Sequence, residues 1–170
     1  SSVAVDDRKE SCAMTSYLIG LGHKDIAIIS AESEVDSIGR LRLEGYRDAF
    51  AENGRPGREE LVRCVEEEID HFSMENGYRT TKKLIESGEK FTAVFATADI
   101  LAIGTCRALL EAGLRIPEDV SVAGFDGIEL GKYYNPAITT MKQPVGEMAE
   151  TTVRLLFDII AGRKEYEHIV

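Results

Sequence analysis

Several features that would quickly assign a chain to a class are scarce in this sequence of 170 residues. Its longest wholly apolar runs are a handful of residues, such as Ile26–Ile29, whereas a bilayer-spanning helix needs about 20. The first residues, SSVAVDDRKE, lack the basic start and the long apolar stretch of a secretory signal. We therefore expect no membrane span and no membrane partner. We expect either a cytoplasmic protein or one whose leader is not part of this sequence.

Cysteine and basic residues are also scarce. Cys12, Cys64 and Cys106 are odd in number, widely spaced and each in or beside an apolar segment, which favours buried free thiols in a reducing compartment over disulfides. The three histidines are too scattered for a metal cluster, so we expect no metal and no cofactor. Lys and Arg number 20 against 30 Asp and Glu, a net charge of −10. Because nucleic-acid binding depends on basic surface, this stretch itself is not expected to hold DNA.

What the sequence does contain is a regular alternation of short apolar runs with longer segments of helical period. This alternation is typical of β-α units around a parallel sheet that is covered on both faces. Strands are predicted at residues 3–5, 26–29, 61–65, 93–96, 120–125 and 138–140, with helices between most of them. Asp99 is expected to be the N-cap of the helix that follows the fourth strand. The fold class is therefore α/β, with a doubly wound parallel sheet.

Four blocks of the sequence resemble the lac/gal repressor family, in the family's order. The longest is GLRIPEDVSVAGFDGIELGKYYNPAITTMKQP at residues 113–144, and the others are LIGLGHKDIAII at 18–29, RLRLEGY at 40–46 and FATADILAIG at 95–104. The resemblance implies a two-lobed core of the periplasmic-binding-protein type I kind, with a small-molecule effector in the cleft. It implies a bacterial transcription regulator and no enzyme, whose DNA contacts come only from an N-terminal headpiece absent from this sequence.

The same resemblance implies how the chain is divided. Residues 24–135 would form a complete C-terminal lobe, and residues 1–23 and 136–170 would be the remnant of the N-terminal lobe. The chain would cross between the lobes near residues 23 and 136.

Two residues are the leading candidates for effector binding. Arg42 is similar to a family arginine that reaches into the cleft with a fork of donors for hydroxyls or a carboxylate, although alone it also reads as a solvated helix arginine, as does Arg40. Asp126 ends a predicted strand, and ligands of open α/β sheets bind beyond the carboxyl ends of strands. Asp126 would accept paired hydroxyls of a sugar, or pair with Arg42 in the empty cleft.

Four further positions complete the expected binding set. Phe72 stands where the family often places an aromatic ring against a sugar or purine, but it also suits a core, and Gln143 resembles a glutamine near the cleft and hinge, or is a surface amide. Asp36 is in a loop where some members place ligand contacts, or is simply solvated. Ala98 replaces an asparagine of sugar-responsive members, and its methyl group offers no hydrogen bond, which argues against a simple lactose-like ligand. The effector is expected to be a sugar, nucleobase or similar metabolite.

The family resemblance also implies a homodimer. We expect its surface to include the helix at 99–112, with Ile103 pointing outward, and the pair Tyr133–Tyr134.

Two other functions remain open. A secreted sugar-binding protein of a transporter has the same two-lobed fold, and a helix-turn-helix or a signal peptide encoded upstream of Ser1 would distinguish the two. A phospho-receiver is suggested by the acidic pair Asp6–Asp7 after the first strand. Its phosphorylatable Asp would end a middle strand, whereas the strands here end at Ser30, Glu66 and Thr97, and no Lys follows Phe125.

Overall fold

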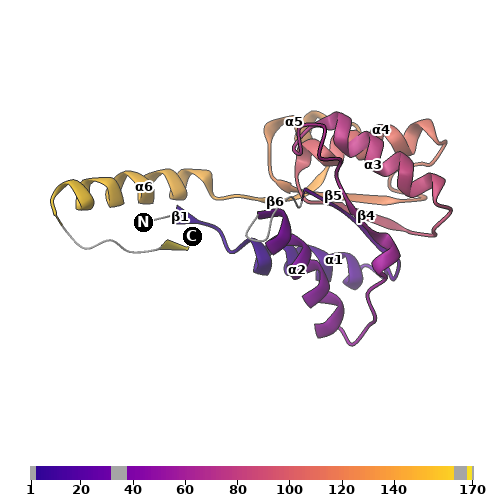
Figure 1. The fold of residues 1–170 in the computed structure, drawn as a ribbon, viewed down its shortest axis with the longest axis horizontal. Coiled ribbons are helices and arrows are strands. Elements are labelled where there is room, and N and C mark those ends of the chain that lie inside the picture. The colour runs from indigo at the N-terminus through magenta and orange to yellow at the C-terminus, as the bar shows by residue number, and fades with distance from the viewer. Residues whose placement is uncertain (1–2, 32–37, 163–167, 170) are drawn as a thin grey trace. The chain divides into compact units, whose positions relative to one another are not determined.

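The computed structural model describes residues 3–31, 38–162 and 168–169 of the chain. Figure 1 shows the elements along it. In order they are β1 (Val3–Ala4), α1 (Asp7–Gly20), β2 (Ile26–Ser30), α2 (Ile38–Glu52), a 3-10 turn η1 (Glu59–Leu61), β3 (Val62–Cys64), α3 (Met74–Glu86), β4 (Ala93–Ala96), α4 (Asp99–Glu111), β5 (Ser121–Asp126), α5 (Glu129–Tyr133), β6 (Thr139–Lys142), α6 (Val145–Ile160) and β7 (His168–Ile169).

The chain forms two compact units, one of residues 7–142 and one of residues 1–6 with 143–170. These boundaries differ from the expected lobe of residues 24–135, because α1 and β6 both belong to the larger unit. The α1 helix packs closely on α2, and the contact depends on Gly45. A Cβ at Gly45 would lie 2.0 Å from the carbonyl oxygen of Arg8 and 2.9 Å from Cβ of Ser11.

The larger unit is built on one five-stranded sheet in the order β3-β2-β4-β5-β6. Every neighbouring pair is parallel, with Ile28 opposite Phe95 and Ala123 opposite Thr139 as points of register. The α/β prediction with a doubly wound parallel sheet is therefore confirmed.

Helices cover both faces of this sheet, with α1 and α2 on one face and α3 and α4 on the other (Figure 1). Successive residues of a strand point to opposite faces. Accordingly Ile26 and Ile28 of β2 pack into the core with α1 and α2, whereas Ala27 and Ile29 pack with α3 and α4. Two apolar layers thus enclose the sheet.

The strand order by itself indicates a ligand position on this sheet. Strand β2 connects to β3 on one side and β3 connects back across to β4 on the other, so the order reverses between β2 and β4. In doubly wound sheets, ligands bind in the crevice at the carboxyl ends of the strands beside such a reversal. In this unit that position lies just after Ser30 and Ala96.

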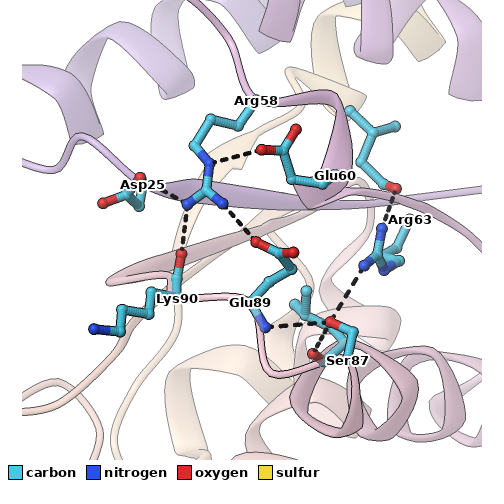
Figure 2. A network of polar contacts seen from close by, with 9 residues as sticks. Asp25, Arg58, Glu60, Arg63, Ser87, Glu89 and Lys90 are labelled. Atoms are coloured by element: carbon cyan, nitrogen blue, oxygen red, sulfur yellow. Dashed lines mark hydrogen bonds and ion pairs between the residues drawn. The ribbon is translucent and has the colours of Figure 1, made fainter.

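A network of charges fastens the opposite, amino-terminal edge of the sheet (Figure 2). Arg58 pairs with Asp25, Glu60 and Glu89, and its Nη1 donates to the carbonyl oxygen of Lys90 at 3.0 Å. These residues precede β2, β3 and β4, so one guanidinium joins three loops. The network is partly exposed, and we interpret it as structural.

The smaller unit contains β1, β7 and α6. Val3 pairs with His168 and Ala4 with Ile169 in a two-stranded parallel ladder. Leu155 is the buried residue of α6. No helix in the described part of the chain has the length and apolar character needed to cross a membrane.

Candidate functional site

Arg42 of α2 is the centre of the candidate site. Its side chain is almost wholly buried, and its Nε donates to Oδ1 of Asp7 at 2.7 Å. Its Nη1 donates to the carbonyl oxygen of Thr97 and lies 3.4 Å from Oδ1 of Asp126. The guanidinium also stacks 3.7 Å from the ring centroid of Phe125. The arginine is therefore held by three acceptors and an aromatic face.

The backbone explains why these groups meet. Thr97 follows β4 directly, Asp126 is the last residue of β5, and Arg42 is in the first turns of the helix that follows β2. The carboxyl ends of β2, β4 and β5 lie at one edge of the sheet, and β2 and β4 flank the reversal of strand order. The position predicted by topology and the position of the buried arginine thus coincide.

The charges at the site define its chemistry. One guanidinium faces two carboxylates, those of Asp7 and Asp126. The Asp7 side chain is 7% exposed and the Asp126 side chain 30%, so Asp126 presents the more accessible acceptor oxygens. Ionised carboxylates only accept hydrogen bonds. The site is thus suited to a ligand that brings hydroxyl or N–H donors.

Asp126 adopts an unusual backbone conformation. Its φ is 112°, and it is the non-glycine residue with positive φ among those described. Few residues other than glycine adopt such angles, although Asp and Asn tolerate them better than most. Gly127 follows with φ 72°, and a Cβ there would lie 2.7 Å from Cγ of Lys142. The end of β5 therefore makes a tight turn whose shape decides where the Asp126 carboxylate lies.

The prediction that Asp99 caps α4 was wrong. The N-cap position is occupied by Ala98, which makes no side-chain cap hydrogen bond, and Asp99 is the first helical residue. Its carboxylate is instead wholly buried, and Oδ2 accepts the backbone N–H of Ile128 at 2.8 Å. Burial raises the pKa of Asp99 against the opposing effects of Thr140, nearby backbone amides and the Arg42 charge.

The structure places the other predicted residues as follows. Phe72 is half-exposed in the loop before α3, after the carboxyl end of β3. Ala98 is buried in the core between the sheet and α3 and α4, at 1% exposure. Gln143 belongs to the smaller unit, directly before α6, and Asp36 lies outside the described residues. Arg42 and Asp126 are thus the predicted pair that the structure brings together.

Sequence reasoning missed Asp7 as a partner of Arg42. The signal available was weak: Asp6 and Asp7 follow a predicted strand, and we interpreted the pair only as a possible receiver feature. The two partners are 35 residues apart, so nothing local connects them. Among the described residues, no group of three or more His, Cys, Asp or Glu side chains is arranged to hold a metal ion.

A hollow of about 490 Å³ lies on the outer side of α3 and α4. Its lining includes Met74, Tyr78, Ile103 and Tyr134. Ile103 is only 7% exposed, so it does not project outward as expected but lies in the wall of the hollow, whereas Tyr133 is 79% exposed. The lining combines these apolar and aromatic side chains with the charged residues Glu75, Arg107 and Glu111.

Comparison with known proteins identifies the family. A family model described as a periplasmic binding protein-like domain matches residues 15–170. The HTH-type transcriptional regulator MalR of Clostridium butyricum is 37% identical over 170 residues, which is 100% of this chain and 49% of the relative. The chain therefore spans about half the length of this curated relative.

Two solved structures extend the similarity. A complex of the transcriptional regulator CelR with cellobiose superposes with a TM-score of 0.89 at 30% identity, covering 99% of this chain and 50% of the other. A LacI family transcriptional regulator from Enterococcus faecium with bound ribose gives 0.84 at 34%, covering 98% and 60%. The chain belongs to the LacI family of transcription regulators and comprises about half of the family's periplasmic-binding-protein-like core, the effector-binding domain.

Proposed function

We propose that this chain senses a small molecule for a bacterial DNA-binding transcription regulator, and that the effector binds at Arg42 and Asp126. The observation that carries the proposal is the convergence of these side chains at the carboxyl edge of the sheet, beside the reversal of strand order. Occupancy of the site would be coupled to operator binding by a headpiece outside these 170 residues. An effector shifts the equilibrium between two states of the protein only when its affinities for the two states differ. We assign the regulator to the cytoplasm, where its operator is.

The proposed effector is a neutral, polyhydroxylated molecule, and a sugar is the leading candidate. Two carboxylates against one arginine leave a negative excess, which disfavours a phosphate or carboxylate ligand and favours a donor of hydroxyl groups. The Enterococcus faecium and CelR structures hold ribose and cellobiose. A nucleobase, whose N–H groups would also suit Asp126, is the alternative effector class. Phe72, Gln143, Asp36 and Ala98 remain proposed neighbours of the bound molecule.

A periplasmic sugar-binding protein is the alternative function. The matched family model is described as a periplasmic binding protein-like domain, and the proteins of both functions share this fold. The MalR relative, which matches the whole chain at 37% identity, is a transcriptional regulator, and this favours the regulator.

We further propose that the regulator is a homodimer through the outer side of α3 and α4. The hollow lined by Met74, Tyr78, Ile103 and Tyr134 would receive apolar side chains of the second copy. Apolar and aromatic side chains gathered on one patch are typical of the buried centre of an interface. Tyr133, which is far more exposed than Ile103, would lie at the rim.

The test is ligand-observed saturation-transfer NMR on the 170-residue chain, a method that detects weak binding. The panel contains ribose, cellobiose, adenine and ribose 5-phosphate, the last as the anionic match of ribose. Each binder is then titrated against Arg42→Ala, Asp126→Ala and the control Arg40→Ala. Arg40 is on the same helix, but it is partly exposed and pairs with Glu44 on the surface.

We expect a neutral member of the panel to bind and ribose 5-phosphate to bind less well than ribose. Arg42→Ala and Asp126→Ala should each weaken binding at least about tenfold, as expected for loss of a hydrogen bond to a charged group. Arg40→Ala should bind as the wild type does. Unchanged affinity in both site variants would remove the effector from this position.

A further inference from the structure

The buried carboxylate of Asp99 makes no direct contact with Arg42 or Asp126 that would explain its burial. It is 0% exposed, and a carboxylate is costly to bury unless its oxygens are hydrogen-bonded. Oδ2 accepts from Ile128 N–H at 2.8 Å. Oδ1 has no hydrogen-bond partner of good geometry within the described part of the chain, although the Thr140 hydroxyl lies close enough to favour the charged form. Helix α4 does not need this carboxylate as its N-cap, so another structural reason is required.

The groups around Asp99 provide that reason. Ile128 immediately follows the turn formed by Asp126 and Gly127, and the Gly127 N–H donates to Oγ1 of Thr140 at 3.3 Å. Asp99 and Thr140 therefore hold two consecutive N–H groups of this turn from α4 and from β6. The turn carries Asp126 at φ 112°, an angle that an aspartate keeps only when its surroundings fix it.

The same short segment also reaches Arg42. Thr97, two residues before Asp99, supplies the carbonyl oxygen that accepts from Nη1 of Arg42. The end of β4 and the start of α4 therefore hold both members of the Arg42–Asp126 pair, one through a carbonyl and the other through the turn.

We propose that Asp99 is a positioning residue for effector binding: its carboxylate fixes the turn 126–128 and thereby holds the Asp126 carboxylate against Arg42. This inference rests on the proposed function for its effect on affinity, but its geometric part does not. Asp99 itself does not touch the effector. Its contribution passes through Asp126, so removal of Asp126 makes Asp99 irrelevant to binding.

The geometric part is tested without any ligand, by NMR of the 170-residue chain. The readouts are the HN–Hα coupling of Asp126, which reports its φ, and hydrogen exchange of the Ile128 amide. In Asp99→Ala we expect the coupling to move toward the value of extended backbone and exchange at Ile128 to accelerate at least about tenfold. Asp99→Asn keeps an acceptor oxygen and should restore most of both readouts.

A second variant perturbs the same contact while leaving Asp99 intact. A Cβ at Gly124 would lie 2.2 Å from Oδ1 of Asp99, so Gly124→Ala should displace the carboxylate and reproduce the changes at Asp126. Thr81→Val is the control for general loss of stability, because it removes a buried hydrogen bond to Thr105 between α3 and α4. It should leave the Asp126 coupling unchanged. An unchanged Asp126 coupling in Asp99→Ala, or the same change in Thr81→Val, would overturn the proposal.

The effect of Asp99 on effector affinity is measured with whichever of the four ligands (ribose, cellobiose, adenine or ribose 5-phosphate) the wild type binds. Asp99→Ala should weaken that ligand about tenfold in the wild-type background and not at all in Asp126→Ala, with Asp99→Asn intermediate. An equal further loss in the Asp126→Ala background would show that Asp99 acts independently and would overturn the inference. Unchanged affinity in both Arg42→Ala and Asp126→Ala would instead refute the proposed function, and the ligand-free measurements would still decide whether Asp99 positions the turn.

Discussion

The buried ion pair between Arg42 and Asp7 allows a quantitative prediction. The two side chains are 4% and 7% exposed, and the Nε–Oδ1 distance is 2.7 Å. Removing one partner of such a pair leaves an uncompensated buried charge, which costs about 3–5 kcal/mol. For Asp7→Asn we expect the low end, about 3 kcal/mol, because Arg42 keeps Asp126 and the Thr97 carbonyl. For Arg42→Met we expect about 4 kcal/mol, because the contact with Phe125 is lost as well.

The double variant Asp7→Asn/Arg42→Met removes both charges together. Its free energy of unfolding should fall by clearly less than the sum of the single losses, which gives a coupling energy of about 2–3 kcal/mol. Urea unfolding followed by circular dichroism measures all four proteins, and equal slopes against urea show that the same surface is exposed. Losses that add to within about 0.5 kcal/mol would mean that the two side chains do not form a coupled buried pair.

Three further outcomes are expected. Gly104→Ala should lower the free energy of unfolding by about 3 kcal/mol in urea, because the new Cβ would lie 1.9 Å from the carbonyl oxygen of Met74; unchanged stability would contradict the close α3–α4 contact. Burial lowers the pKa of His23, so the unfolded state binds the proton more readily. The stability that depends on a neutral His23 is therefore fully present above the pKa of histidine in the unfolded chain, near 6.5, and is lost as the pH falls below it. In thermal melts, His23→Asn should flatten this decline of the melting temperature with falling pH. Ile103→Asp with Tyr134→Asp should sediment as a folded monomer under conditions in which the wild type is a dimer, whereas identical sedimentation would refute the proposed interface.

The sheet was predictable because its signals are local. Apolar runs such as Ile26–Ile29 are buried on both faces, and a strand of that kind shows itself as a continuous hydrophobic stretch. Once the strands are in order, the carboxyl edge follows, and Asp126 at the end of one strand and Arg42 near the start of a helix must approach it. The general position of the candidate site was therefore accessible from the sequence.

The remaining features depend on contacts between distant residues. The Asp7 partner of Arg42 is 35 residues away, and the Ile128 partner of Asp99 is 29 residues away. A carboxylate at the start of a helix looks the same in sequence whether it caps that helix or fastens another turn, so Asp99 was misassigned. The division into units also depends on close packing at Gly45, which no periodicity reveals.

Effector binding at Arg42 and Asp126 is tested most directly by mapping the bound effector on the chain by ¹H–¹⁵N NMR. The 170-residue chain is titrated with the sugar that gives saturation transfer, and shifts are followed for backbone amides and for the Nε–H of Arg42. We expect the largest shifts at Arg42, at the turn of Asp126 and Gly127 and next to Thr97, with none around Arg58 at the opposite edge of the sheet. Shifts centred on the Arg58 network or on the outer hollow of α3 and α4, with Arg42 and Asp126 unmoved, would contradict it.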